Sequence, residues 1–266
     1  MKIITDHNIT HDNYYQDTEY VTNSMLSKIS EKSPLYLQHW LQNKPEPSAA
    51  MKLGSALHCK FLTPELYDKQ WVKAPDVDKR TKAGKEIWEK FISEHDKNQI
   101  LTQTDSDIIE CMSQSLNKNK SIINLFKNGQ PESIVCFEDE VTGMKCKCMI
   151  DYIIMSDANK IIIDLKTTND ASNNFINSIF KFKYHKQAAF YMDAVGAEKY
   201  YIVAVEKSAP WAINVFELGQ ESYFEGQALY RNELNLYADC KNKNFWPDYG
   251  HEFLGSIMEE KQITIF

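Results

Sequence analysis

The sequence lacks any long apolar run, and no stretch approaches the roughly 18 consecutive apolar residues of a membrane-spanning helix. Residues 1–7 do not resemble the apolar region of a signal peptide. The six cysteines lack the even spacing of a disulfide framework, so we expect reduced thiols and a cytoplasmic protein. Positive charge is not in excess, because the formal net charge is −7. This balance argues against a general nucleic-acid coat protein, but it leaves room for a local basic patch.

No internal repeat or low-complexity linker divides the 266 residues, and their number fits one globular domain. Residues 1–21 are polar and rich in tyrosine, which predicts an irregular arm, and residues 22–120 are expected to be mainly helical. Pro34 should interrupt the first of these helices. The expected helices in this part span residues 24–43, 49–62, 81–95 and 104–118.

The hydrophobic period then changes, and residues 131–241 are expected to form a core built on strands. The order of elements predicts an α/β fold with a mixed central sheet flanked by helices, plus an N-terminal helical extension. The expected elements are strands at 132–139, 145–155 and 160–167, helices at 174–181 and 184–196, strands at 199–206 and 211–217, and a helix at 220–241.

Two predicted strands each carry an aspartate, and a lysine follows one of them. Asp164 and Lys166 are two residues apart, so their side chains point to the same face of a strand, about 7 Å apart. Asp164 could hold a divalent metal ion while Lys166 reaches an attacking water or a phosphate. Asp-x-Lys alone occurs by chance and could be a polar strand end. Asp151, however, lies within the preceding strand, where aspartate is disfavoured without a purpose, and paired carboxylates suit Mg²⁺.

Four further residues are candidates for the same site. His58 lies within an apolar helix, where a packed core histidine is the alternative to a metal ligand. Gln187 and Tyr191 share one helix face and could bond a phosphate or a base, or order the lysine. The alternative is an amphipathic helix with a half-buried tyrosine. Glu132 could share the metal ion or position a water, or it could be a solvated charge.

Two clusters of positive charge could contact nucleic acid, and basic residues interleaved with aromatic ones suit backbone contact and base stacking. Each cluster could equally be a solvated helix face. The expected DNA contacts are Arg80, Lys82 and Lys85 in the first cluster and Lys183 and Lys186 in the second.

The candidate residues belong to short segments that occur in one order along residues 20–250. These segments are Gly54–His58, Arg80–Lys85, Pro131–Ser133, Thr142–Gly143, Lys145–Lys147 leading to Asp151, Asp164–Thr168 and Tyr184–Tyr191. Together they resemble the RecE family, the exonuclease VIII nuclease domain, within the RecB-like PD-(D/E)xK nucleases.

The resemblance implies that residues 131–241 are a nuclease core and that the protein is a Mg²⁺-dependent exonuclease, with Mn²⁺ able to substitute. Such an enzyme degrades one strand of linear duplex DNA from its 5′ end and leaves 3′ single strands for recombination by annealing. The resemblance also implies a phage or prophage setting, a homo-oligomeric ring such as a tetramer and a single-strand annealing partner. The lack of a long apolar run separately predicts no contact with a membrane. By analogy, the metal ligands are His58, Asp151 and Asp164, the residue that orients or deprotonates the water is Lys166, and the supporting residues are Glu132, Gln187 and Tyr191.

Some RecB-like relatives carry an iron–sulfur cluster on several C-terminal cysteines. Only Cys240 lies beyond the helix of Gln187 here, so no cluster is expected. Cys146 and Cys148 point to one face of a strand without a second Cys/His pair at zinc-site spacing, and they are expected to pack in the sheet.

Two other functions remain open from the sequence. An endonuclease on the same core would use the same residues, and cutting of closed circular DNA would distinguish it. A nuclease-fold protein that binds DNA or protein without cleaving it is the other, although the intact set of Asp151, Asp164 and Lys166 argues against it.

Overall fold

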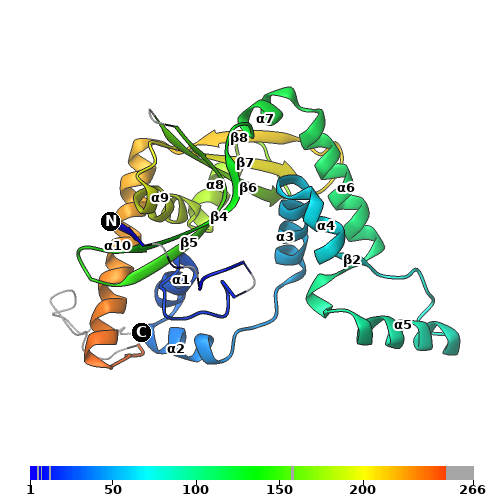
Figure 1. Cartoon of the computed structure of the whole chain (residues 1–266), viewed down its shortest axis with the longest axis horizontal. Coiled ribbons are helices and arrows are strands. Elements are labelled where there is room, and N and C mark those ends of the chain that lie inside the picture. The colour runs from blue at the N-terminus through cyan, green and yellow to red at the C-terminus, as the bar shows by residue number, and fades with distance from the viewer. Residues whose placement is uncertain (5, 7, 12, 157–158, 250–266) are drawn as a thin grey trace, which may run out of the picture.

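A six-stranded mixed sheet lies at the centre of the computed structural model, which describes residues 1–249 except residues 5, 7, 12 and 157–158 (Figure 1). The strands lie in the order β1–β4–β5–β6–β7–β8. Each neighbouring pair is antiparallel except β6 and β7, which are parallel. The expected α/β fold with a mixed sheet between helices is confirmed. The strands are β1 (Lys2–Ile4), β4 (Gln130–Glu138), β5 (Lys145–Met155), β6 (Lys160–Thr168), β7 (Lys199–Glu206) and β8 (Ile213–Glu217).

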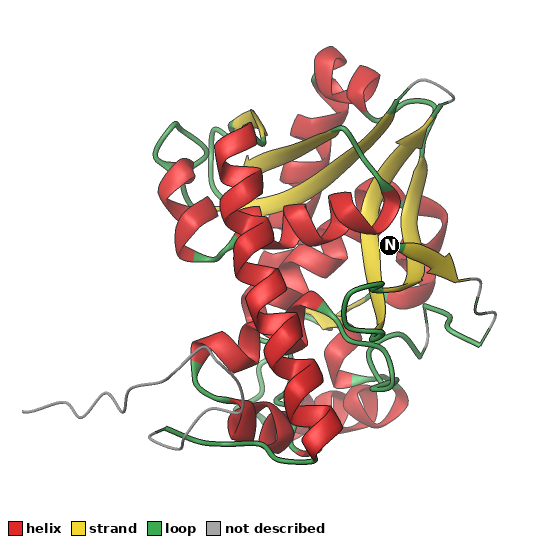
Figure 2. Cartoon of the chain, turned by 90° about the vertical axis from the view of Figure 1, so that its left-hand side faces the viewer, coloured by secondary structure: helices red, strands yellow, loops and turns green. Residues whose placement is uncertain are grey.

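One face of the sheet is covered by helices from both ends of the described chain, and the long helix α10 crosses this side in Figure 2. Its core includes Leu26, Phe190 and Leu234, which pack against strand residues such as Ile162. Cys146 and Cys148 are fully buried in this core, as expected. The helices are α1 (Asn23–Glu31), α2 (Pro34–Gln42), α8 (Phe175–Lys181), α9 (Tyr184–Val195) and α10 (Gln220–Lys243).

The opposite face is covered by α3 and α6, whose Leu57 and Ile109 pack against Ile163 and Val203. Ile162 and Ile163 belong to opposite cores because successive side chains of a strand point to opposite faces. The helices here are α3 (Ala49–Leu62), α4 (Pro64–Gln70), α6 (Gln103–Lys118) and α7 (Lys120–Leu125).

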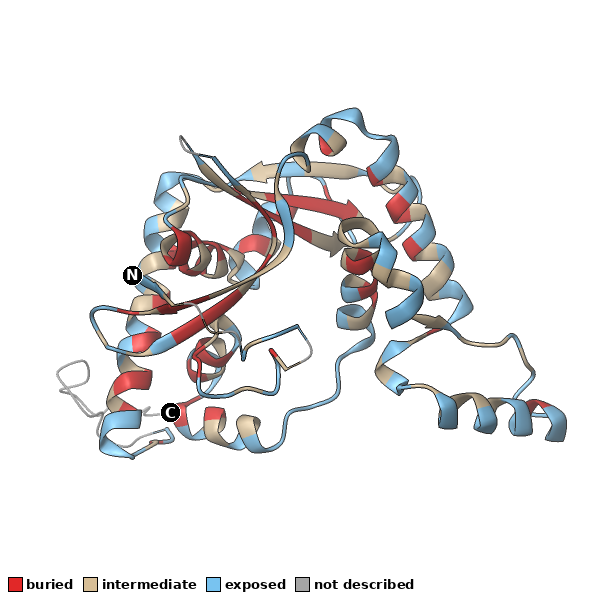
Figure 3. Cartoon of the chain, in the orientation of Figure 1, coloured by how far each residue is buried: buried red, intermediate tan, exposed pale blue. Residues whose placement is uncertain are grey.

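A protruding segment leaves the main body between two short parallel strands, β2 (Val72–Lys73) and β3 (Ile100–Leu101). It carries α5 (Lys82–Glu94) and a 3₁₀ turn, η1 (Lys97–Gln99). Only Gly84 of α5 is buried, and Figure 3 shows this helix largely exposed at the edge of the molecule.

The local sequence explains most helix boundaries. Ser33 accepts a hydrogen bond from the Tyr36 amide, and Pro34 occupies the first turn of α2, so the expected break between two helices occurs there. The arm at residues 1–21 is not wholly irregular, because β1 pairs with β4 at the edge of the sheet. No helix in the described part of the chain has both the length and the apolar character of a membrane span.

Candidate active site

Three acidic residues lie at one level across three neighbouring strands. The pairing of β4 with β5 sets Glu132 opposite Asp151, between the pairs Pro131–Tyr152 and Ser133–Ile150. The ladder between β5 and β6 ends at the pair Tyr152–Ile163, one residue short of Asp151 on β5 and Asp164 on β6. There the Asp151 carboxylate accepts a hydrogen bond from the Leu165 amide at 2.9 Å. The strand register thus brings carboxylates together from residues far apart in sequence.

Helix α3 adds an imidazole to this group. Leu53, Ala56 and Leu57 bury one side of the helix against the sheet and hold His58 beside it. The His58 Nδ1 atom lies 3.6 Å from an Asp151 carboxylate oxygen, and Nε2 lies 2.6 Å from the Leu165 carbonyl oxygen. The bond to the carbonyl orients the ring, a role that such partners often have around metal-binding histidines.

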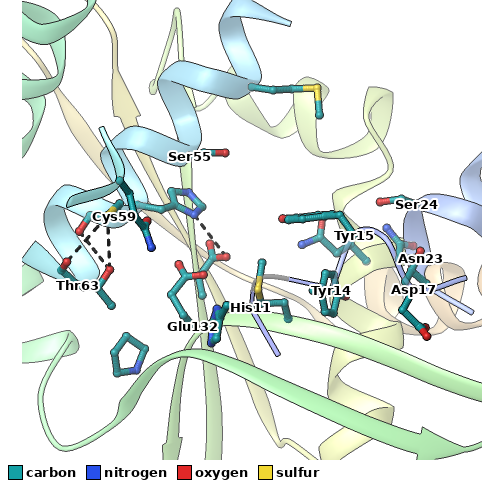
Figure 4. A pocket seen from close by; sticks show the side chains of 18 of the residues that line it. His11, Tyr14, Tyr15, Asp17, Asn23, Ser24, Ser55, Cys59, Thr63 and Glu132 are labelled. Atoms are coloured by element: carbon teal, nitrogen blue, oxygen red, sulfur yellow. Dashed lines mark hydrogen bonds and ion pairs between the residues drawn. The ribbon is translucent and has the colours of Figure 1, made fainter. Parts of the chain in front are cut away.

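His58, Glu132 and Asp151 form a group of possible metal ligands. One ligand atom from each lies within 4.8 Å of the others, and all three residues are half-buried. Figure 4 shows the Glu132 side chain at a cavity that all three residues line. Carboxylate oxygens suit Mg²⁺ and Mn²⁺, and imidazole is acceptable to Mn²⁺ and other transition metals. The donor set therefore fits a divalent cation.

Glu132 adopts a backbone conformation that is rare for a side-chain-bearing residue, with φ at +46°. Burial raises the pKa of its carboxyl group to about 7, with a further contribution from the neighbouring Asp151 and an opposing one from His58. Such strain and such pKa shifts concentrate at functional sites.

The buried Asp164 and the half-buried Lys166 form an ion pair next to the three-residue group. Their carboxylate and ammonium atoms lie 2.5 Å apart, and Gln187 donates a hydrogen bond to the other Asp164 oxygen at 3.1 Å. Burial raises the pKa of Asp164, Asp151 adds to this effect, and Lys166 opposes it. Burial lowers the pKa of Lys166, but the carboxylates of Asp164 and Asp151 outweigh it and the net pKa is raised. Lys166 therefore stays positively charged.

Two tyrosines complete the surroundings of this pair. The Lys166 ammonium lies 5.2 Å from the centre of the Tyr184 ring. Tyr200 is buried, and its burial and the nearby Asp164 carboxylate raise its pKa well above the usual range.

A cavity of about 760 Å³ opens beside the group of His58, Glu132 and Asp151. Gln187 and Tyr191 also line it, whereas Asp164 and Lys166 are not among its lining residues. The opposite wall comes from the N-terminal arm, with Tyr14 and Tyr15 facing the cavity in Figure 4. The remaining lining residues include His11, Asp17, Trp40, Lys44, Met51, Leu66 and Trp71.

The candidate DNA contacts do not form one surface. Arg80 is 92% exposed at its side chain and bonds Asp78, and Lys82 and Lys85 are exposed on α5. Lys183 is half-buried and donates a hydrogen bond to Ser30.

Lys186 is fully buried, against the expectation that it contacts DNA. Its ammonium group bonds Glu233 at 2.5 Å and Ser27 at 3.0 Å. The position follows from the helix period, because Lys186 faces α10 and α1 rather than solvent. The expectation that Lys186 contacts DNA is therefore wrong.

Some parts of the site carry no sequence motif. The Leu165 carbonyl is a backbone group, so no residue type marks it. Tyr14 and Tyr15 lie on an arm whose sequence predicted only irregular structure. The richness of that arm in tyrosine was the one available signal.

The family comparison agrees with this geometry. Residues 23–253 match a family described as a PDDEXK-like domain of unknown function (DUF3799). The chain belongs to this family. The expected membership of the PD-(D/E)xK nuclease superfamily is therefore confirmed.

One solved structure shows the same fold, and a second matches the chain over a similar share of its length. A candidate exonuclease from Eubacterium rectale is 17% identical, with a TM-score of 0.68 over 90% of this chain and 89% of that chain. A phage-related exonuclease from Haemophilus somnus 129PT is 15% identical over 85% of this chain and 96% of that chain, with a TM-score of 0.38. No curated protein matches the sequence.

Proposed function

We propose that this PDDEXK-like domain is a divalent-metal-dependent exodeoxyribonuclease that degrades linear double-stranded DNA. The observation that carries the proposal is the meeting of His58, Glu132 and Asp151 beside the Asp164–Lys166 pair. Closely spaced carboxylates that repel one another favour a bound cation, and a lysine beside them suits charge that develops on a phosphate.

The proposed metal ligands are His58, Asp151 and Asp164, and Glu132 offers a further ligand atom close to those of His58 and Asp151. When bound, Mg²⁺ would draw charge from the scissile phosphate and lower the pKa of a bound water. His58 is held for this role by the Leu165 carbonyl, and Asp151 is held by the Leu165 amide.

Lys166 is the proposed residue that orients the attacking water and balances negative charge on the phosphate. Its raised pKa keeps the ammonium group charged at neutral pH, so it acts as a fixed positive charge. Gln187 holds the Asp164 carboxylate, and Tyr191 borders the cavity as a support for the strand being cleaved.

The proposed phosphate contacts away from the site are Arg80, Lys82, Lys85 and Lys183. Polarity from the 5′ end, use of Mg²⁺ with Mn²⁺ as a substitute, a ring-shaped homo-oligomer and a single-strand annealing partner are supported by the resemblance to the RecE family. In this proposal the products are 3′ single strands for recombination.

The test is nucleotide release from linear duplex DNA with a 5′ phosphate, compared with a closed circle. The reactions contain Mg²⁺, Mn²⁺ or EDTA and use the wild type and Asp164→Asn. The expected result is release from the linear form only, lost in EDTA and in the variant. Labels at the 5′ or the 3′ end then determine polarity.

Two results would overturn the proposal. Cutting of the closed circle would indicate an endonuclease on the same core. If the protein bound DNA but cleaved it neither with Mg²⁺ nor with Mn²⁺, it would be a binding protein.

A further inference from the structure

The N-terminal arm is fixed beside the candidate active site by bonds to a distant strand. The Lys147 ammonium group is fully buried and bonds the carbonyl and the carboxylate of Asp17 at 3.1 and 2.9 Å. The same ammonium lies 4.8 Å from the centre of the Tyr14 ring, and Tyr14 is only 6% exposed. The Lys44 ammonium bonds the Tyr15 carbonyl at 2.5 Å. The backbone around Tyr15 is therefore held on both sides.

The Tyr15 side chain is different, because it is 68% exposed although its backbone is fixed. Its ring meets the Tyr14 ring edge-on, with centres 5.1 Å apart, and it points into the cavity in Figure 4. A phenol is uncharged at neutral pH. The ring is therefore an uncharged flat surface at the cavity that His58, Glu132 and Asp151 also line.

The wall around Tyr15 suits a nucleobase better than a phosphate. Trp40 and Met51 add apolar surface to the cavity, and Lys44 adds positive charge at its rim. Bases stack on aromatic side chains without regard to sequence, and a neighbouring lysine can meet the backbone phosphate. A cavity of about 760 Å³ has the size of a small-ligand site, which suits a separated strand end.

We propose that Tyr15 stacks on a base next to the scissile phosphate, so that the arm positions a separated single strand against the metal site. This inference rests on the proposed nuclease function and names the form of DNA that the site takes. Tyr15 then binds all four bases in the same way, because stacking does not involve the hydrogen-bonding edge of a base.

The first test measures stacking without cleavage. Short DNA with 2-aminopurine near its 5′ end is added with Ca²⁺ in place of Mg²⁺, and its fluorescence is followed. Wild-type protein should quench the probe, Tyr15→Ala should not, and Tyr15→Phe should recover most of the quenching that Tyr15→Ala loses. The matched control is Tyr249→Ala, which removes a tyrosine that is 72% exposed and does not line the cavity.

The second test measures kcat and KM on linear DNA whose bases near the 5′ end are present or abasic. Tyr15→Ala should raise KM roughly tenfold or more on normal DNA, the loss expected from one stacking contact. On abasic DNA the wild type and the variant should be nearly equal.

An equal loss from Tyr15→Ala on normal and abasic DNA would overturn the proposal, as would unchanged quenching in that variant. Failure of the nuclease proposal looks different. In that case the wild type would quench the probe through Tyr15 and yet hydrolyse neither DNA.

Discussion

At the scale of single residues, Glu132 is a side chain whose charge is disfavoured by its surroundings. It combines a left-handed backbone with a carboxyl pKa of about 7, because it is buried beside Asp151. In a metal-free protein this carboxyl binds a proton more tightly when folded than when unfolded. The associated stability is fully present below the unfolded-state pKa near 4.5 and is lost as the pH rises through about 7.

Glu132→Gln should therefore raise the free energy of unfolding in EDTA at pH 8, by at most about 3 kcal/mol, and change it little at pH 4.5. Urea denaturation at both pH values measures the difference. Glu138→Gln, on the same strand, is the control. Equal effects of pH on the wild type and Glu132→Gln would contradict the assigned cause.

In contrast to Glu132, Lys166 has a charge that its surroundings stabilise, because the carboxylates of Asp164 and Asp151 lie close to it. Lys166→Ala should lower kcat about 10²- to 10³-fold, as expected when one preorganised positive group is removed, with a small change in KM. It should also destabilise the protein, because the buried Asp164 carboxylate loses its partner.

Steady-state kinetics on linear duplex DNA, with circular dichroism to confirm folding, tests the role of Lys166. The matched control is Lys199→Ala, which removes an exposed lysine paired with Glu217 on the same sheet. Normal turnover in Lys166→Ala would remove this residue from the mechanism.

At the scale of elements, α10 approaches α9 so closely that a side chain has no room between them. A Cβ atom at Gly226 would lie 2.3 Å from the His185 carbonyl oxygen. Gly226→Ala should therefore destabilise the protein by about 1–3 kcal/mol, although alanine favours helices.

Gly54→Ala is the matched change inside another helix. Its Cβ atom would meet only the Thr167 hydroxyl at 3.9 Å, so the variant should gain up to about 1 kcal/mol. Chemical denaturation of both variants measures the contrast. Two changes of the same sign would contradict the packing argument.

The elements also explain which parts of the site the sequence could predict. Strand periodicity and the position of Pro34 are local signals, so the strands of Asp151 and Asp164 and the break before α2 were predictable. The contact of the arm depends on Lys147 and Asp17, which are 130 positions apart. Lys186 was assigned wrongly because its cluster looked basic in sequence, whereas its partner Glu233 lies on a helix distant along the chain.

At the scale of the whole molecule, α5, which carries Lys82 and Lys85, lies at one extreme of the long axis and α10 at the other (Figure 1). If α5 contacts DNA, replacing Lys82 and Lys85 with alanine should weaken duplex binding equally for all sequences. It should also reduce the slope of log affinity against log salt by about 2.

Fluorescence anisotropy at several salt concentrations measures this slope. Lys241→Ala with Lys243→Ala removes the same charge from the far end of α10 and is the control. Equal slopes for both double variants would show that α5 makes no special contact.

The two-residue pairing of β2 with β3 has a consequence for protein engineering. The pair closes the base of the α5 segment, where the Ala74 amide also bonds the Leu101 carbonyl at 2.8 Å. The segment thus enters and leaves the body at one point, without crossing the six-stranded sheet. Residues 75–99 therefore form an exchangeable unit, and replacing them with the corresponding stretch of a relative should leave the six-stranded sheet and the candidate site in place.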